Sequence, residues 1–211
     1  MSSTIWPVRA LGTWQTVVRA AAIVVVAAVV IGGLTSPAQQ YLPDAIRSLA
    51  NAAGPWFVTV LAAVYAGRSR PIVAVVLGIA GFLLLNISYG VVSELRGFAY
   101  SAGPYNIWSI LAFPVGVVAG LAASWLRSSR LMLLAMGAAA PAAVLLGEGM
   151  YGLTVNLATT GPVVWVLELV GGVALLVVFS LVSLRRVRPI ALCVGLAVAG
   201  AVVLDTGLRL V

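Results

Sequence analysis

The 211-residue sequence contains no lysine, no histidine and a single cysteine, Cys193. Without lysine the chain cannot form a Schiff base, which excludes retinal pumps and lysine-linked pyridoxal chemistry. Without histidine it has no Ser-His-Asp triad, no histidine-ligated haem or zinc and no imidazole relay. One cysteine excludes an intrachain disulfide and paired-thiol redox chemistry. Carboxylic acids are therefore the groups left for acid–base chemistry.

Charge is also scarce, because charged residues make up 8% of the chain and apolar residues 63%. A soluble domain has about 25% charged residues. The mean hydropathy of +1.15 lies far above such a domain. No polar stretch is long enough to form a large soluble domain, so we expect an all-α, multi-pass protein of the cell membrane.

Apolar runs of about 20 residues, the length of a membrane-spanning helix, occur seven times. We expect residues 16–211 to form one seven-helix domain, preceded by an interfacial segment, residues 1–15, with Trp6 and Trp14 as anchors. The predicted spans are Thr16–Thr35, Ser48–Ala66, Pro71–Ser93, Asn106–Leu126, Leu131–Leu153, Pro162–Leu184 and Pro189–Leu208.

The twelve positively charged residues, all arginines, divide unequally between the two ends of these spans, with nine on one side and three on the other. Positive residues concentrate in cytoplasmic loops. The division therefore predicts a cytoplasmic N-terminus and an outer C-terminus. Because the arginines flank spans, we expect them to meet lipid headgroups and not nucleic acid.

All five carboxylic acids fall in the predicted outer half: Asp44, Glu94, Glu148, Glu168 and Asp205. Glu148 lies about 26 Å from the inner end of its span and Glu168 about 9 Å from the outer end of the next, at 1.5 Å per residue. Ionisable side chains inside spans are costly and usually face a protein interior, a cavity or a partner. We expect both glutamates to line one cavity; the alternative is a structural role, as ion pairs with arginine or as helix caps.

Polar and aromatic residues lie near these two acids. Tyr151 shares a helix face with Glu148, Trp165 shares one with Glu168, and Asn86 lies at a depth comparable to Glu148, on one stripe with Tyr89. We predict Glu148, Glu168 and Asn86 as catalytic residues. The predicted substrate contacts are Tyr89, Tyr151, Trp165, Asp205, Glu94 and Trp108. The position of Trp56, Tyr105 and Trp108 at span ends favours an interfacial aromatic belt for these three residues. For the deeper Tyr89, Tyr151 and Trp165, a belt and a pocket are equally open.

Three segments, Leu34–Asp44, Ser48–Trp56 and Gly147–Gly152, resemble a family of small actinobacterial membrane proteins. The size and the scattered intramembrane acids are also similar to those of the membrane-bound terpene cyclases of meroterpenoid biosynthesis. The second resemblance implies metal-free cyclisation of a prenylated substrate, started by a proton from a Glu or Asp.

These observations lead to three functional hypotheses. The first is a membrane terpene cyclase, an isomerase-type enzyme, in which Glu148 or Glu168 protonates a farnesyl-type lipophilic substrate. The second is a small proton-coupled transporter or channel using the same acids, and the third is a non-catalytic accessory protein, favoured if the acids pair with arginine. We expect no cofactor and no metal, since the chain lacks the Asp-Asp pair that binds magnesium diphosphate. The expected partners are membrane lipids and a lipophilic small molecule, and the sequence leaves the oligomeric state open.

Overall fold

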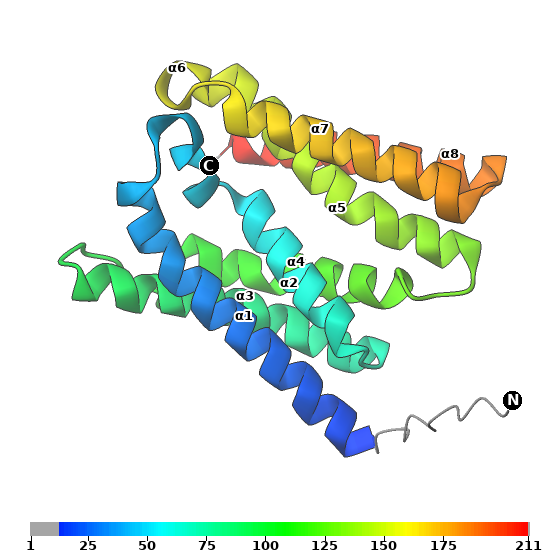
Figure 1. Cartoon of the computed structure of the whole chain (residues 1–211), viewed down its shortest axis with the longest axis horizontal. Helices are drawn as coiled ribbons and strands as arrows, with labels where there is room; N and C mark the ends of the chain where they lie inside the picture. Colours follow the sequence, from blue (N-terminus) through cyan, green and yellow to red (C-terminus); the bar gives the residue numbers. More distant parts are fainter. Residues whose placement is uncertain (1–12, 211) are drawn as a thin grey trace, which may run out of the picture.

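A computed structural model describes residues 13–210, which fold into eight α-helices and contain no β-strand (Figure 1). The predicted interfacial segment lies outside the described residues, except for its last residues, which begin α1. The helices are α1 (Thr13–Tyr41), α2 (Ala53–Gly67), α3 (Pro71–Leu95), α4 (Ile107–Trp125), α5 (Leu131–Tyr151), α6 (Leu157–Thr160), α7 (Val163–Val178) and α8 (Val187–Leu208). A 3-10 segment, η1 (Asp44–Ala50), precedes α2, and two π-helical segments, η2 (Gly152–Asn156) and η3 (Phe179–Leu184), follow α5 and α7.

Six helical stretches are long and apolar enough to cross a membrane, and the number is seven if η1 and α2 together count as one span. The chain is therefore a multi-span membrane protein. Four of the last five predicted spans agree with an observed α-helix to within two residues at each end, and the fifth, Pro162–Leu184, covers α7 together with η3. The helical stretch that begins at Leu131 continues beyond the predicted Leu153 to Thr160. Apolar runs bounded by Pro, Gly and Arg were sufficient to locate these spans. Helix α1 is longer than predicted, because it continues past Thr35 and through Pro37 to Tyr41.

The predicted second span, Ser48–Ala66, is not one continuous helix. The chain is interrupted at Asn51 and Ala52, and the axes of η1 and α2 differ by 54°. Pro55 provides the physical reason, since a proline ring clashes with the carbonyl four residues earlier in a helix but is tolerated in the first turn. Helix α2 accordingly begins at Ala53, two residues before this proline.

Helix α2 connects the two halves of the molecule. One core cluster contains residues of α1, α2, α3 and α4, with Val24, Phe57, Leu85 and Ala119 among its buried members. A second cluster joins α5, η3 and α8 around Cys193. Helix α2 contacts α1, α3 and α4 on one side and α5 on the other, and lies between the two groups in Figure 1. The first turn of α2 is thus placed in the interior.

Glycines allow α3 and α4 to approach closely, as the spacing of Gly116 and Gly120 suggests. A Cβ atom on Gly116 would lie 2.5 Å from the Cα atom of Ile79, and one on Gly78 would overlap the Gly116 carbonyl. The backbones of the two helices are therefore in direct contact.

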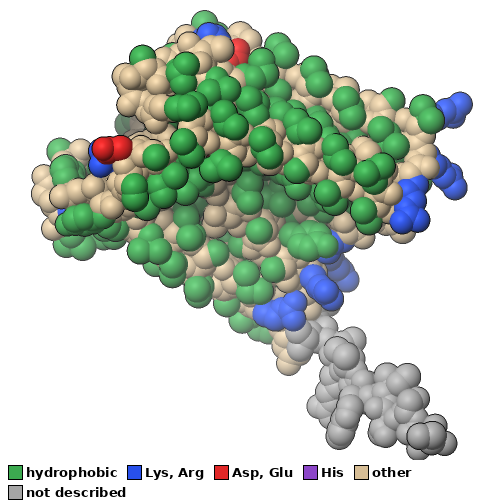
Figure 2. Space-filling view, turned by 45° about the horizontal axis from the view of Figure 1, so that its top comes forward, with side chains coloured by type: hydrophobic (Ala, Val, Ile, Leu, Met, Phe, Trp, Pro, Cys, Tyr) green, Lys and Arg blue, Asp and Glu red, His purple; other side chains and the backbone are tan. Residues whose placement is uncertain are grey.

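Arginine side chains gather at one end of the molecule, whereas acidic side chains appear near the other end (Figure 2). The arginine-rich end consists of the start of α1 and the α2–α3, α4–α5 and α7–α8 connections. Arg127 stabilises this end by donating to the carbonyls of Tyr65 (2.8 Å) and Ser69 (2.7 Å), close to the C-terminus of α2. The separation of arginines and acids agrees with the predicted arrangement of spans; which side of the membrane each end faces stays a prediction.

Candidate functional site: an acid pair at a helix break

The interruption before α2 leaves the backbone N–H groups of its first turn without a side-chain cap. Ala52, the residue before the helix, has an extended backbone and no side-chain oxygen that could accept a hydrogen bond. The first N–H groups of any helix have no acceptor within the helix, and the partial positive charge there attracts anions. In the membrane interior, these groups need an acceptor from elsewhere in the protein.

Glu148, near the end of α5, supplies that acceptor. The N–H of Ala53 donates to Oε1 of Glu148 (N···O 2.6 Å), and the N–H of Gly54 donates to Oε2. Glu148 is only 6% exposed. The carboxylate therefore caps α2 from a position 95 residues later in the chain.

Glu168, on α7, lies beside this cap and has no partner of its own. It is 5% exposed, and both its carboxyl oxygens are buried without a hydrogen bond. A methyl group in place of the Gly54 hydrogen would lie 2.8 Å from Oε1 of Glu168 and 3.0 Å from Oε2 of Glu148. The two carboxyl groups thus meet at Gly54, and we refer to Glu148 and Glu168 as the acid pair.

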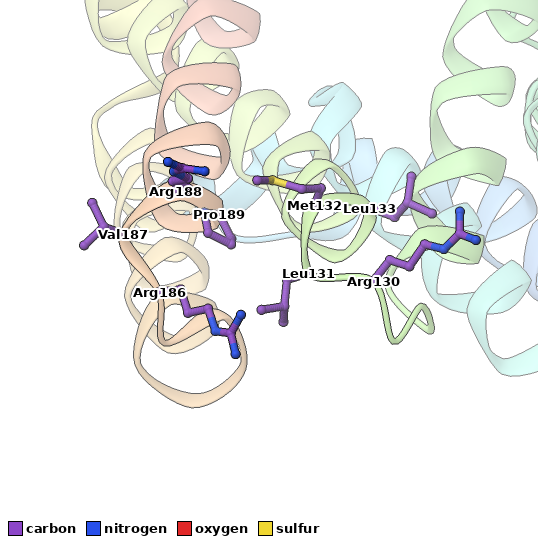
Figure 3. A pocket seen from close by; sticks show the side chains of 8 residues that line it. All are labelled: Arg130, Leu131, Met132, Leu133, Arg186, Val187, Arg188 and Pro189. Atoms are coloured by element: carbon purple, nitrogen blue, oxygen red, sulfur yellow. The ribbon is translucent and has the colours of Figure 1, made fainter.

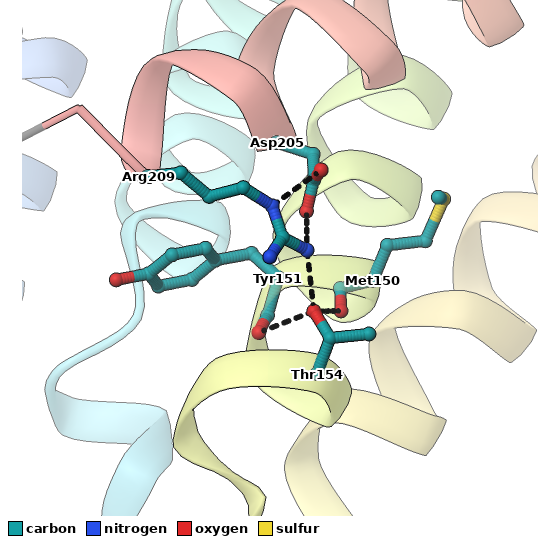
Figure 4. Close-up of polar contacts among 5 residues, drawn as sticks. All are labelled: Met150, Tyr151, Thr154, Asp205 and Arg209. Atoms are coloured by element: carbon teal, nitrogen blue, oxygen red, sulfur yellow. Dashed lines mark hydrogen bonds and ion pairs between the residues drawn. The ribbon is translucent and has the colours of Figure 1, made fainter.

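Within residues 13–210, no arginine forms an ion pair with the acid pair. The two ion pairs found there are Arg47–Asp44 and Arg209–Asp205. Figure 4 shows the second of these: Arg209 holds Asp205 through two hydrogen bonds of 2.9 Å and also donates to Thr154 (2.5 Å). This network joins the end of α8 to η2. The arginine pairing that would favour an accessory role is therefore absent from the described residues.

Asn86 belongs to a different network, between α3 and the chain that leads into α4. Its amide donates to Oγ of Ser109 (2.9 Å), and the Tyr100 hydroxyl donates to its Oδ1 (2.6 Å). Asn86 is completely buried. Burial raises the pKa of Tyr100, so its hydroxyl stays a proton donor at neutral pH. None of these hydrogen bonds reaches the acid pair, and Asn86 holds the loop before α4 against α3.

Two small cavities adjoin the first turn of α2. One has a volume of about 190 Å³ and is lined by Gln39, the backbone segment 50–53 and four aromatic residues, and the other is apolar and about 130 Å³. Ala53, Trp56 and Trp108 line both. The aromatic residues of the first cavity are Trp56, Tyr89, Tyr100 and Trp108, whose rings contact one another edge to face. Neither member of the acid pair lines either of these cavities. Ala53, however, lines both cavities and also donates its N–H to Glu148.

The other predicted substrate contacts are scattered. Trp165 is buried against Gly152 and donates to Thr160 (2.8 Å), beside the acid pair. Tyr151 is half-buried, Glu94 is exposed, and Asp205 forms an ion pair with Arg209. Tyr89 and Trp108 line the aromatic cavity.

Sequence reasoning missed two parts of this site. It assigned Trp56 to the interfacial belt, but Trp56 lines both cavities and donates to Thr35 (3.1 Å). It also gave no role to Gly54, although the Gly54-Pro55 pair is a typical sign of a helix boundary and could have located the break.

Comparison with known proteins adds a family but no activity. No curated protein and no solved structure matches this chain. The family whose model matches has no assigned function, and the match shows no link to terpene cyclases. Over residues 12–210 the chain matches the family model described as "Family of unknown function (DUF6518)", and it therefore belongs to that family.

Proposed function

We propose that this protein is a small proton-coupled membrane transporter and that the acid pair is its proton-binding site. The observation that carries the proposal is Glu168, a buried carboxyl group with no hydrogen-bond partner, next to a second buried carboxyl group. Two adjacent negative charges without a cation are strongly unfavourable in a low-dielectric interior. The pair therefore holds a proton, and release of that proton changes the charge at the start of α2.

Helix α2 offers a route by which this charge can affect a bound solute. Ala53 donates its N–H to Glu148 and also lines both cavities. Half-helices whose N-termini face a site inside the membrane are common in secondary transporters. Protonation of the pair weakens the attraction between Glu148 and the α2 N-terminus, which alters the wall of the cavities. Proton binding and solute binding are coupled when both act on one such element.

The size of the cavities favours a small solute over a prenylated substrate. Sites for drug-sized ligands measure roughly 300–1,000 Å³. The two cavities of about 190 and 130 Å³ are smaller than this range. A cyclase would also need direct contact between an acid and the reacting carbon atom, and neither Glu148 nor Glu168 lines either cavity.

The transporter proposal predicts a charge movement when protons bind. In proteoliposomes on a solid-supported membrane, a rapid step from alkaline to mildly acidic buffer should produce a transient current in wild-type protein. Glu168→Gln should lose most of this current, because an amide cannot take up the proton. Glu94→Gln, which changes an exposed glutamate of α3, is the matched control and should retain it.

Transport itself is tested with the same vesicles. Loaded with a defined mixture of small polar metabolites and placed under a pH gradient, wild-type vesicles should gain or lose at least one solute faster than Glu168→Gln vesicles. Equal currents and equal solute contents for wild type and Glu168→Gln would contradict the proposal.

A membrane terpene cyclase remains the second candidate, favoured by the aromatic rings of Trp56, Tyr89, Tyr100 and Trp108 around one cavity. Aromatic faces stabilise cations, as a carbocation intermediate requires. If this candidate holds, purified protein converts a farnesylated indole to a cyclic product without Mg²⁺, and both Glu148→Gln and Glu168→Gln abolish conversion. Conversion that survives both substitutions would rule out the acid pair as its proton source.

A further inference from the structure

A second candidate binding site lies at the arginine-rich end, far from the acid pair along α5. A groove of about 760 Å³ separates the start of α5 from the start of α8 (Figure 3). Three arginines line it, Arg130 before α5 and Arg186 and Arg188 at the start of α8. In Figure 3 the side chain of Arg186 extends toward Leu131 and that of Met132 extends toward Arg188, whereas the side chain of Arg130 points away from the other two arginines. The groove thus combines the cationic side chains of Arg186 and Arg188 with an apolar wall.

The arginines of this groove lie at the N-termini of α5 and α8, where a positive charge is unfavourable unless an anion is bound. Arg130 and Arg186 occupy the N-cap positions of α5 and α8, where neither helix has a side-chain cap or an acidic residue in its first turn. Helix N-termini carry a partial positive charge and favour acidic side chains, so arginines there add repulsion. An anion in the groove would remove this conflict.

The guanidinium groups of these three arginines are also available. Within residues 13–210, none of them forms a hydrogen bond, an ion pair or a ring contact. Arg127, in the same connection as Arg130, is different, because its guanidinium is taken up by the carbonyls of Tyr65 and Ser69. Arg127 therefore has a structural role, whereas the guanidinium groups of the groove arginines are exposed.

We propose that this groove binds the headgroup of an anionic phospholipid. Its phosphate would accept hydrogen bonds from the arginines and from the uncapped N–H groups of α5 and α8. The acyl chains would lie on apolar side chains that are exposed beside the groove, such as Met132 (46% exposed) and Val187 (83%). Basic pockets between helix ends at the membrane surface suit such lipids. The positive-inside rule explains arginines at this end, but it requires neither that Arg186 and Arg188 line one groove with α5 nor that two helix starts are uncapped.

The test measures lipid binding to the full-length protein in detergent, with phosphatidylglycerol as the anionic probe and phosphatidylcholine as the zwitterionic one. Native mass spectrometry should show phosphatidylglycerol retained in preference to phosphatidylcholine, and phosphatidylglycerol should raise the melting temperature. The double variant Arg186→Gln/Arg188→Gln should weaken phosphatidylglycerol binding by about 30-fold, the expected effect of two cationic groups near a membrane surface.

Three controls keep the proposal falsifiable. Arg70→Gln removes another N-cap arginine of the same end, before α3 and outside the groove, and should leave binding unchanged. Arg186→Lys/Arg188→Lys preserves the charge and should retain most of the binding, and Arg130→Gln serves if the double glutamine variant does not fold. Equal binding of the two lipids, equal loss in Arg70→Gln and the groove variants, or displacement of the lipid by inorganic phosphate alone would overturn the proposal.

Discussion

Glu148→Ala should lower the free energy of unfolding by about 2–5 kcal/mol, because it leaves the N–H groups of Ala53 and Gly54 without an acceptor in the protein interior. Both N–H groups donate to this one carboxylate in the native structure. Water cannot replace it, since the side chain is almost completely buried. Unfolding of the purified protein in mixed micelles, followed by circular dichroism, measures the loss.

Two further variants separate the capping role from a general effect of losing a glutamate. Glu148→Gln keeps one acceptor oxygen and should lose less stability than Glu148→Ala. Glu94→Ala removes an exposed carboxylate, and its removal leaves no hydrogen-bond donor of the described residues without an acceptor. Surface changes of this kind usually alter stability by less than about 0.5 kcal/mol. If Glu148→Ala proves as stable as Glu94→Ala, the cap on α2 is not a stabilising contact.

Gly54→Ala is expected to have the second large effect, since it places a methyl group between the two carboxyl groups. The new atom would lie 2.8 Å from Oε1 of Glu168, 3.0 Å from Oε2 of Glu148 and 3.2 Å from a methyl carbon of Leu145. Overpacking of a dense interior costs about 1–3 kcal/mol. We also expect the proton-dependent current to fall, because the carboxyl groups must move apart.

The matched control is Gly195→Ala in α8, where a methyl group meets no atom within 4 Å. Alanine is favoured over glycine inside a helix by roughly 0.5–1 kcal/mol, so this variant should be neutral or stabilised. Shortening one acid, as in Gly54→Ala/Glu168→Ala, makes room and should recover part of the lost stability. Identical melting curves for Gly54→Ala and Gly195→Ala would show that the acids do not meet at Gly54.

The limits of sequence reasoning are clearest at the second span. Hydropathy averages composition along the chain, and the segment from Asp44 to Gly67 is apolar enough to pass as one span although it bends at Asn51 and Ala52. The same averaging ended α1 near Thr35, whereas the polar residues that follow, including Gln39, are helical. Gln39 is held by Ala50 and Asn51, through hydrogen bonds that exist only after the chain folds back.

The predicted catalytic residues Glu148, Glu168 and Asn86 lie at similar depths in the bundle, but depth alone does not determine which side chains meet. Depth along a span placed Glu148, near the end of α5, and Glu168, near the start of α7, in one layer, and the structure brings their carboxyl groups together at Gly54. The expected shared cavity is different, because the two acids line neither cavity beside α2. Asn86 has a similar depth but faces Ser109 and Tyr100. Depth specifies a layer of the bundle, whereas the partners of a side chain depend on how each helix is rotated about its axis.

By itself, the sequence determined that this is an all-α membrane protein, the approximate ends of most of its spans, the separation of most arginines from the acids, and the absence of lysine and histidine chemistry. These properties follow from composition and from the length of the apolar runs, because a helix must be long enough and apolar enough to cross the hydrocarbon layer. Only the tertiary structure decided that α2 starts inside the protein, that its first N–H groups are capped by Glu148, and that Glu168 joins them without a partner. Those contacts link residues nearly a hundred positions apart, and they depend on helix packing that no local pattern encodes.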